Sequence, residues 1–312
     1  MFCLQNFFIR AIINGMETLL NDNSIFDLSS CKACPLECGA NRLNGVGRCG
    51  VEGLKIAKYY LHPFEEPCIS FQNGSGTIFF CGCNLQCAFC QNYEVSRAKR
   101  GKSVTPQELA DIFKELEDKG ADNISLVTPT HVSPYLLKAF ELYQPNVPVV
   151  YNSGGYEKIQ TLQRLDPFID IYLPDLKFFS PALSKRYTGR EDYFERASEA
   201  ILFMAKKPTV FSKQGKMLSG LIVRHLVMPL CSDDSVKIVK WFFENLPNTA
   251  YLSLMSQYTP FGETQKYPEL ARRITKREYE KVLSMAQELG IQNLFIQERN
   301  SSGETYIPSW DF

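Results

Sequence analysis

Three closely spaced cysteines are the residues of this chain best suited to do chemistry. Cys83, Cys87 and Cys90 follow the spacing CxxxCxxC, and Phe89 stands directly before the last of them. Three thiolates on one tight loop can hold a four-iron cluster while leaving its fourth iron open to a small molecule. Stable electron carriers usually close such a cluster with four thiolates. The spacing therefore indicates a reaction at iron.

A second set of cysteines precedes this loop. Cys31, Cys34, Cys38 and Cys49 are interspersed with glycines that permit tight turns. In a chain without a secretory signal, such clustered spacings favour metal over disulfides. The four could bind zinc as a closed structural module, bind an auxiliary iron–sulfur cluster as an electron relay, or not bind as a complete set, because soft metals share thiolate ligands.

Length and charge exclude several classes of protein. The 312 residues are 45% hydrophobic and fit one large α/β domain with a small appendage. Lys+Arg and Asp+Glu both number 34, so the net charge of zero does not favour a nucleic-acid-binding protein. No apolar run approaches the roughly 20 residues that cross a bilayer. Residues 1–13 read poorly as a signal peptide, which predicts a cytoplasmic protein whose translation starts at Met1 or at Met16.

Apolar strands alternate with amphipathic helices from about residue 76 onward. Thr105 and Glu108 form a capping-box pattern, and apolar residues then repeat at helical spacing. The predicted strands are 76–80, 123–127, 147–151, 169–173, 218–227, 250–258 and 293–297. The predicted helices are 105–120, one opening at 133, 156–165, 191–205, 233–244 and 276–289.

This alternation predicts a parallel sheet built from βαβ units. Six or seven such units curl into a full or partial parallel (β/α) barrel, in which the loops after the strands carry the reactive residues. The cysteine loop and the polar segments 128–131, 152–155 and 174–177 would gather at that rim. The predicted division of the chain is an N-terminal extension (1–30), a cysteine-rich metal-binding module (31–72) and the barrel domain (73–312).

The cysteine loop after a first strand resembles the signature of the radical S-adenosylmethionine (radical SAM) superfamily. From about Cys31 onward, the chain resembles the subgroup of pyruvate formate-lyase activating enzyme-like iron–sulfur proteins. The matching phrases, besides Cys31 to Cys49, are HPFEEP (62–67), GSGTIFF (74–80), RHLVMP (224–229) and LMSQY (254–258). The resemblance implies a radical SAM barrel with a 4Fe-4S cluster that reductively cleaves SAM to a 5′-deoxyadenosyl radical, which abstracts hydrogen.

The resemblance also assigns residues around the cluster. Cys83, Cys87 and Cys90 would be the iron ligands, and Phe89 would pack near the adenine of SAM. Related activating enzymes carry a Gly-Gly-Glu type motif where this chain has residues 128–131, so Thr130 would meet the methionyl amine instead.

Further assignments fall on the later strands. Asp175 and Lys177 match an Asp-Leu-Lys motif that binds SAM. Arg224 would hold the SAM carboxylate through its two-pronged guanidinium group, and Gln257 would lie near the ribose.

The leading functional hypothesis is an oxygen-sensitive enzyme that abstracts hydrogen from a protein or peptide, in the manner of a glycyl radical enzyme activating enzyme. Its partners would be that substrate and a flavodoxin or ferredoxin type of reductant. A second hypothesis keeps the radical chemistry but changes the target to a small molecule or to another peptide modification. A third is a non-catalytic metal-binding scaffold or electron carrier.

Overall fold

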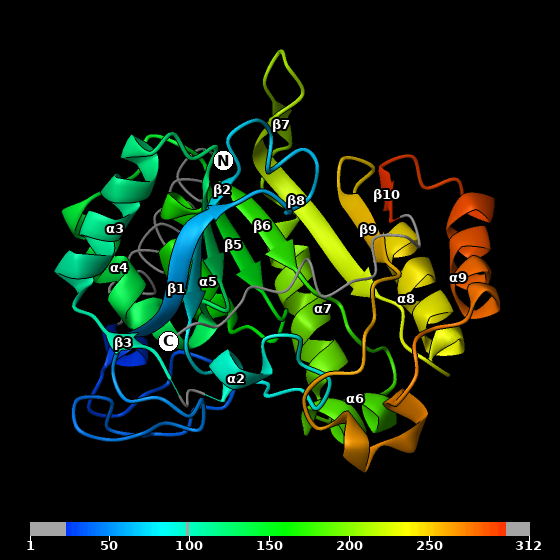
Figure 1. Cartoon of the computed structure of the whole chain (residues 1–312), viewed down its shortest axis with the longest axis horizontal. Coiled ribbons are helices and arrows are strands. Elements are labelled where there is room, and N and C mark those ends of the chain that lie inside the picture. The colour runs from blue at the N-terminus through cyan, green and yellow to red at the C-terminus, as the bar shows by residue number, and fades with distance from the viewer. Residues whose placement is uncertain (1–22, 98–99, 298–312) are drawn as a thin grey trace, which may run out of the picture.

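The structure, a computed structural model, describes residues 23–97 and 100–297. One curved sheet runs through it in the order β10-β9-β8-β6-β5-β4-β2-β1-β3, with β7 paired to β8 (Figure 1). The strands are β1 (Lys55–His62), β2 (Ser75–Phe80), β3 (Lys102–Ser103), β4 (Ile124–Val127), β5 (Val149–Ser153), β6 (Ile171–Pro174), β7 (Val210–Phe211), β8 (Met217–Leu226), β9 (Tyr251–Met255) and β10 (Leu294–Ile296).

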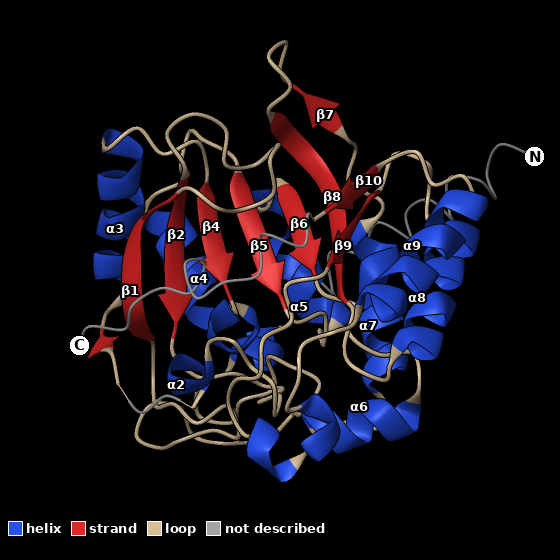
Figure 2. Ribbon diagram, turned by 45° about the vertical axis from the view of Figure 1, so that its right-hand side comes forward, coloured by secondary structure: helices blue, strands red, loops and turns tan. Residues whose placement is uncertain are grey.

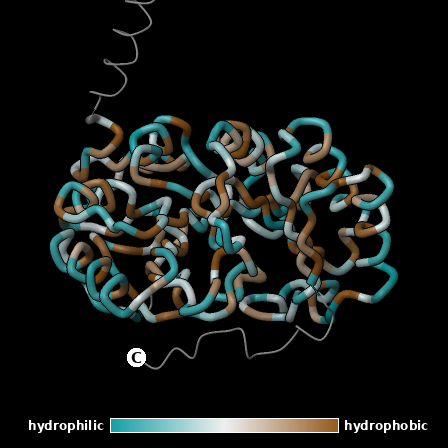
Figure 3. Tube along the Cα trace, turned by 90° about the horizontal axis from the view of Figure 1, so that it is seen from above, coloured by the Kyte–Doolittle hydropathy of each residue, from teal (hydrophilic) through white to brown (hydrophobic). Residues whose placement is uncertain are grey.

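Helices connect these strands and cover the outer face of the sheet. They are α2 (Tyr93–Ser96), α3 (Pro106–Asp118), α4 (Ser133–Leu142), α5 (Ile159–Leu165), α6 (Pro181–Thr188), α7 (Tyr193–Met204), α8 (Ser232–Asn245) and α9 (Lys276–Glu288). None of the described helices is both long enough and apolar enough to span a bilayer. In the view from above, hydrophilic segments follow much of the periphery (Figure 3).

The central strands are parallel, as the alternation of strands and helices predicts. Each adjacent pair from β2 through β4, β5, β6, β8 and β9 to β10 is parallel. The carboxyl ends of these strands therefore meet at one edge, where the loops crowd together (Figure 2). In the described part of the chain the sheet ends at β10 on one side and β3 on the other, so the barrel is a partial one.

The outer face of the sheet forms the main hydrophobic core with the helices. Ile78 and Leu126 point outward and pack in the same core as Leu109 and Phe113 of α3. The predicted capping box of α3 is confirmed, because the Thr105 side chain accepts from the Glu108 backbone N–H and the Glu108 carboxylate accepts from the Thr105 N–H.

An antiparallel edge extends the sheet beyond the predicted barrel. β1 pairs with β2 and with β3, both antiparallel, and the β1–β2 pairing contains a bulge between Ile56 and Lys58. Nearly all β1 residues are half-buried. Apolar and polar residues therefore do not alternate clearly along this segment, and no such alternation predicts the strand. β1 lies within residues 31–72, and the cysteine-rich module therefore shares a strand with the sheet.

The loop from β1 to β2 folds under the sheet and plugs the inner side of the partial barrel. Cys68 and Ile69 of this loop form a small second core with inward-pointing residues of β5, β6 and β8, among them Val150, Leu173 and Ile222. The Asp122 carboxylate fixes the end of the loop, since its Oδ2 accepts from four successive backbone N–H groups, residues 71–74, at 2.8–3.1 Å.

Candidate functional site

The three cysteines lie on the loop that leaves the carboxyl end of β2. Gly82 begins this loop with a φ of +87°, and a Cβ there would lie 2.7 Å from the backbone oxygen of Cys49. Only glycine fits this close approach without strain. The same contact continues one residue later, where the Cys83 N–H donates to the Cys49 oxygen at 3.0 Å.

The environment of these thiols is buried and close to a cation. Burial raises the pKa values of Cys83 and Cys87, and the neighbouring thiols raise them further, while the charge of Lys177 opposes the shift. Without metal the thiols are therefore protonated. Iron binding has to displace those protons, as metal binding to cysteine generally does.

The spacing of the thiols suits a cluster better than a single ion. In the described ranges, no three His, Cys, Asp or Glu side chains are grouped tightly enough to hold one metal ion. A four-iron cluster needs a wider arrangement, because each cysteine binds a different iron. Cys83 and Cys90 lie close enough to Cys87 to help raise its pKa, and all three thiols border the same cavity. The donor set thus fits the three-thiolate cluster that the sequence predicts.

A cavity of about 770 Å³ opens beside the cysteine loop, on the inner face of the sheet. It is bounded by the loops that follow β2, β4, β5, β6 and β9, by β8 and β10, and by the β1–β2 loop. The predicted site residues that line it are Cys83, Cys87, Phe89, Cys90, Asp175, Lys177, Arg224 and Gln257. The structure therefore brings together every predicted site residue except Thr130.

An ionic network connects the predicted SAM-binding residues. Asp175 accepts from Lys177 Nζ at 2.5 Å and from Arg224 Nε at 2.9 Å. Arg224 also donates through Nη2 to Asn152 Oδ1 at 2.7 Å. Burial alone would raise the pKa of Asp175, but the charges of Arg224 and Lys177 outweigh it and hold that pKa below its ordinary value. Asp175 is therefore ionised, and it aligns both cations along the cavity wall.

Thr130 lies apart from this network. It begins a short 3-10 turn and is buried, and its hydroxyl donates to Glu157 at 2.6 Å. Tyr151 donates to the other Glu157 oxygen at 3.1 Å, and burial raises the pKa of Glu157 to about 7. The residue of this loop that lines the cavity is Thr128, which has a φ of +61°.

The two remaining predicted contacts, Phe89 and Gln257, both line the cavity. Phe89 is buried, with its ring edge-on to Phe178 at a centroid distance of 5.8 Å. Gln257 lies just beyond β9, where its Nε2 is 3.8 Å from Met255 Sδ. Both side chains therefore border the cavity without occupying it.

Several cavity residues carry no sequence-based role. Asn152, at the end of β5, orients Arg224, and Glu65 and Glu66 reach the cavity from the β1–β2 loop. The two acids belong to the HPFEEP phrase, where a pair of adjacent carboxylates between prolines was the available signal. Nothing in the local pattern shows that this loop turns inward.

The N-terminal cysteines surround a buried arginine. Cys31, Cys34 and Cys49 are buried and Cys38 is half-buried. A Cβ on Gly47 would lie 3.2 Å from Cys49 Sγ, 3.7 Å from Cys38 Sγ and 3.4 Å from Arg42 Cδ. The Arg42 side chain is among the largest fully buried ones, and it donates to the backbone oxygens of His131 and Gly53. Burial raises the pKa of Cys49 although the charge of Arg42 opposes that shift, whereas at the less buried Cys38 burial is outweighed by backbone N–H groups and Arg42, which lower the pKa.

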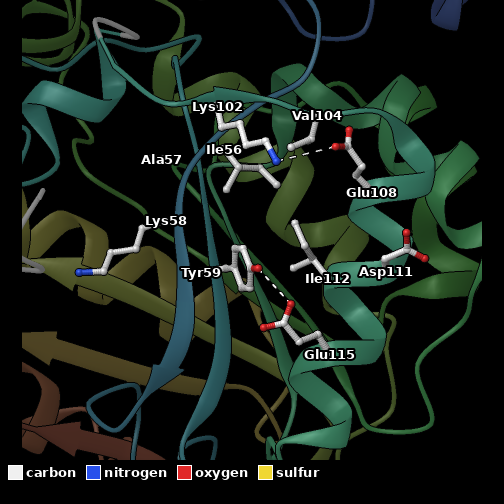
Figure 4. Close-up of a pocket in the computed structure, with 10 residues that line it drawn as sticks. All are labelled: Ile56, Ala57, Lys58, Tyr59, Lys102, Val104, Glu108, Asp111, Ile112 and Glu115. Carbon is white, nitrogen blue, oxygen red and sulfur yellow. Dashed lines mark hydrogen bonds and ion pairs between the residues drawn. The ribbon is translucent and has the colours of Figure 1, made fainter. Parts of the chain in front are cut away.

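A separate pocket of about 430 Å³ lies on the outer side of the molecule, between β1 and α3 (Figure 4). Its polar side chains are mostly paired with one another, since Lys102 faces Glu108 at 3.8 Å and the Tyr59 hydroxyl donates to Glu115 at 3.0 Å. No cysteine and no predicted site residue lines it. The chemistry is therefore assigned to the inner cavity.

Two comparisons with known proteins concern the family of the chain. Residues 77–210 match the family described as the Radical SAM superfamily. Over 279 residues the chain is 31% identical to the uncharacterized protein MJ0674 of Methanocaldococcus jannaschii, an alignment that covers 85% of this chain and 77% of that protein.

Two solved structures align with part of the chain. SuiB of Streptococcus suis bound to its precursor peptide SuiA aligns with a TM-score of 0.46 and 14% identity, over 69% of this chain and 46% of SuiB. The aligned part is thus less than half of the SuiB chain. Methylornithine synthase (PylB) aligns with a TM-score of 0.44 and 13% identity, over 69% of this chain and 68% of that one. The chain belongs to the radical SAM superfamily, whose enzymes use a 4Fe-4S cluster and SAM to generate a 5′-deoxyadenosyl radical.

Proposed function

We propose that this protein abstracts a hydrogen atom from a protein or peptide substrate, as a glycyl radical enzyme activating enzyme does. The observation that carries the proposal is the cysteine loop opening onto a cavity lined by Asp175, Lys177 and Arg224. The subgroup phrases of the sequence supply the analogy to activating enzymes, and the substrate assignment rests on that analogy.

In this proposal Cys83, Cys87 and Cys90 hold the cluster. When bound, the cluster and SAM supply the reductive cleavage that yields the 5′-deoxyadenosyl radical. Lys177 sits beside Cys87 and favours its thiolate form. Arg224 still has N–H donors beyond those bound to Asp175 and Asn152, and these can take the SAM carboxylate. The plug beneath the cavity limits the access of water from below.

The test is anaerobic reconstitution with iron, sulfide, dithionite and SAM. Wild type should release 5′-deoxyadenosine, and Cys87→Ala should not. Cys231→Ala is the matched control, because it also removes a buried thiol but lies at the start of α8 and does not line the cavity. Equal product from wild type and Cys87→Ala would refute the radical mechanism. A glycyl radical signal in electron paramagnetic resonance, after incubation with a candidate glycyl radical enzyme and a flavodoxin or ferredoxin, would support the activase assignment.

We also infer that Cys31, Cys34, Cys38 and Cys49 bind a metal centre of net negative charge. The support is Arg42, whose hydrogen bonds in the described chain go to backbone oxygens and whose Nε has no partner. A buried cation without a counter-ion is costly, whereas four thiolates on a metal supply the missing negative charge. The backbone hydrogen bond between Cys83 and Cys49 brings the N-terminal cysteines next to the cysteine loop. We therefore favour an iron–sulfur cluster that relays electrons over a structural zinc ion as the identity of this metal centre.

Metal analysis of wild type and Cys34→Ser distinguishes these identities. An auxiliary iron–sulfur cluster predicts that the variant loses about half of its iron, whereas structural zinc predicts loss of zinc with iron unchanged. A variant with unchanged content of both metals would contradict the inference.

A further inference from the structure

Two acidic side chains enter the cavity from the side opposite the cysteine loop. Glu65 and Glu66 follow β1, which runs antiparallel to β2, so their loop starts at the amino-terminal end of β2 and reaches inward as far as Asn152, near the carboxyl end of β5. Glu65 Oε1 lies 3.4 Å from Ser125 Oγ and 3.4 Å from Asn152 Nδ2. The two acids thus form the floor of the cavity, above the plug made by Cys68 and Ile69.

The floor is a fixed part of the fold. The Glu66 backbone oxygen accepts from the N–H groups of Ile69 and Ser70, which closes a tight turn. The Ser70 hydroxyl also accepts from the Glu65 N–H and donates to the His62 oxygen, each at 3.2 Å. These bonds hold the carboxylates of the acid pair toward the inner face of the sheet.

The charges of the cavity wall do not balance. Three acidic side chains line it, those of Glu65, Glu66 and Asp175, against two cations, Lys177 and Arg224. Burial raises the pKa values of Glu65 and Glu66, so keeping both of them ionised requires a further positive charge beside them. Both cations are hydrogen-bonded to Asp175. The acid pair therefore shares in the charge of Arg224 but has no cation of its own among the described lining residues.

Two polar side chains at the floor of the cavity also lack hydrogen-bond partners among the described residues. Glu66 is 9% exposed, and no full hydrogen bond to its carboxylate is formed within the described ranges. Burial raises the pKa of Glu66, and the hydroxyl of the completely buried Ser253 lies near enough to oppose that shift without reaching the geometry of a hydrogen bond. Buried polar groups are normally satisfied. A nearly buried carboxylate and a buried hydroxyl that face one another without a bond indicate that a ligand completes the set.

We propose that Glu65 and Glu66 bind a cationic group of the substrate, namely the side-chain ammonium or guanidinium of a lysine or arginine in the peptide. The inference rests on the proposed function and specifies its substrate class. A cation at the floor supplies the missing positive charge and the missing N–H donors together. The peptide bond next to that residue then lies toward the cysteine loop, where hydrogen abstraction takes place.

Binding of two matched tripeptides tests this assignment. The probes are acetyl-Gly-Lys-Gly-amide and acetyl-Gly-norleucine-Gly-amide, which differ in the terminal ammonium, titrated into reconstituted holoenzyme with SAM present. The lysine peptide should bind more tightly to wild type, and Glu65→Gln and Glu66→Gln should each weaken it about tenfold to a hundredfold. Binding of the norleucine peptide should stay the same. Glu244→Gln, an exposed acid on α8, is the control and should leave both affinities at the wild-type value.

A second readout separates this proposal from the function beneath it. Release of 5′-deoxyadenosine without peptide should persist in both Gln variants, because the acids hold the peptide and not SAM, although Glu65→Gln alters a contact with Asn152 and so changes the rate of release more than Glu66→Gln does. Loss of that release in the variants would overturn the proposal, since the acids would then belong to the SAM site or to the fold. Equal affinity of wild type for the two peptides would overturn it as well.

Free lysine amide identifies the source of the cation. If free lysine amide binds more weakly than the lysine peptide, the substrate is a peptide. If the two bind equally well, the peptide assignment is overturned in favour of a small amine. If wild type releases no 5′-deoxyadenosine at all, the proposed function fails, and the preference for lysine over norleucine still tests the acid pair on its own.

Discussion

Removing the charge of Asp175 should be among the most damaging single changes in the cavity wall. Asp175→Asn keeps the size of the side chain but takes away the one carboxylate that hydrogen-bonds both Lys177 and Arg224. Both ion pairs are well shielded, with side-chain exposures of 17% for Asp175, Lys177 and Arg224 alike. The variant would leave two partly desolvated cations without their shared partner.

The expected loss in the free energy of unfolding depends on how many ion pairs are broken and on how far they are buried. Breaking a buried ion pair by removing one partner costs about 3–5 kcal/mol. Arg224 keeps some compensation, because Glu65 and Glu66 are close enough to raise its pKa. The loss should therefore fall near the lower end, at about 3 kcal/mol, which for a chain of 312 residues corresponds to a fall in melting temperature of roughly 5 °C.

Thermal unfolding followed by circular dichroism measures this effect on proteins prepared identically. Asp233→Asn is the matched control, because it breaks a surface pair with Lys281 in which the side chains are 86% and 47% exposed. Exposed pairs contribute about 0–1 kcal/mol, so the control should melt within about 2 °C of wild type. The double variant Asp175→Asn/Arg224→Gln should lose less than the sum of the two single variants, since they share one interaction.

Two results would refute this reasoning. If Asp175→Asn has the same melting temperature as the Asp233→Asn control, the ionic network adds nothing to stability. Strict additivity in the double variant would mean that Asp175 and Arg224 are not coupled.

Three further predictions concern the scaffold around the cavity. Gly155→Ala should lower the unfolding temperature more than Gly189→Ala does. Both glycines have a positive φ, but a Cβ on Gly155 would lie 2.2 Å from the backbone oxygen of Asp175, whereas a Cβ on Gly189 would face open space. Equal falls in unfolding temperature would contradict this steric argument. Burial lowers the pKa values of His131 and His225 to about 4, so the folded state leaves them neutral while the unfolded chain protonates them near pH 6.5. The contribution of these histidines to the free energy of unfolding should therefore be constant above that pH, and it should fall by about 1.4 kcal/mol per pH unit and per histidine between pH 6.5 and 4. Urea denaturation midpoints measured from pH 7 to 5 should show this fall. If His225→Gln leaves the pH dependence of the midpoint unchanged, His225 does not contribute to it. Thr105→Ala removes the 3.1 Å bond to the Glu108 N–H and should cost about 1 kcal/mol in urea denaturation; an unchanged midpoint would show that the cap is dispensable.

The parallel part of the fold could be predicted because its signals are local. Apolar runs such as β4 and β5 are buried on both faces, and α3 carries both its capping box and its apolar stripe in the sequence. β1 could not be predicted in the same way. It is a half-buried antiparallel strand whose register depends on β2, across a loop that only tertiary packing shapes.

The same difference separates the predicted site residues from the missed ones. The cysteines and Asp175 follow predicted strands and Arg224 lies in the second half of one, so the rule that reactive residues gather at the carboxyl edge predicts that they meet, and all of them line the cavity. The rule gives no side-chain direction within a loop. Thr130 turns toward Glu157 because a 3-10 turn begins there. Glu65 and Glu66 come from the opposite edge of the sheet, which the rule does not address.

The carboxylate of Asp122 gives the cavity floor a property that its acids alone would lack. By accepting from four successive amides it joins the β1–β2 loop to the start of β4, so the loop opens only when that part of the sheet opens. The amide protons of residues 71–74 then belong to the slowly exchanging unit of the protein rather than to its surface loops. A ligand that reaches the floor meets carboxylates already held in place, and its association costs little conformational entropy in the protein.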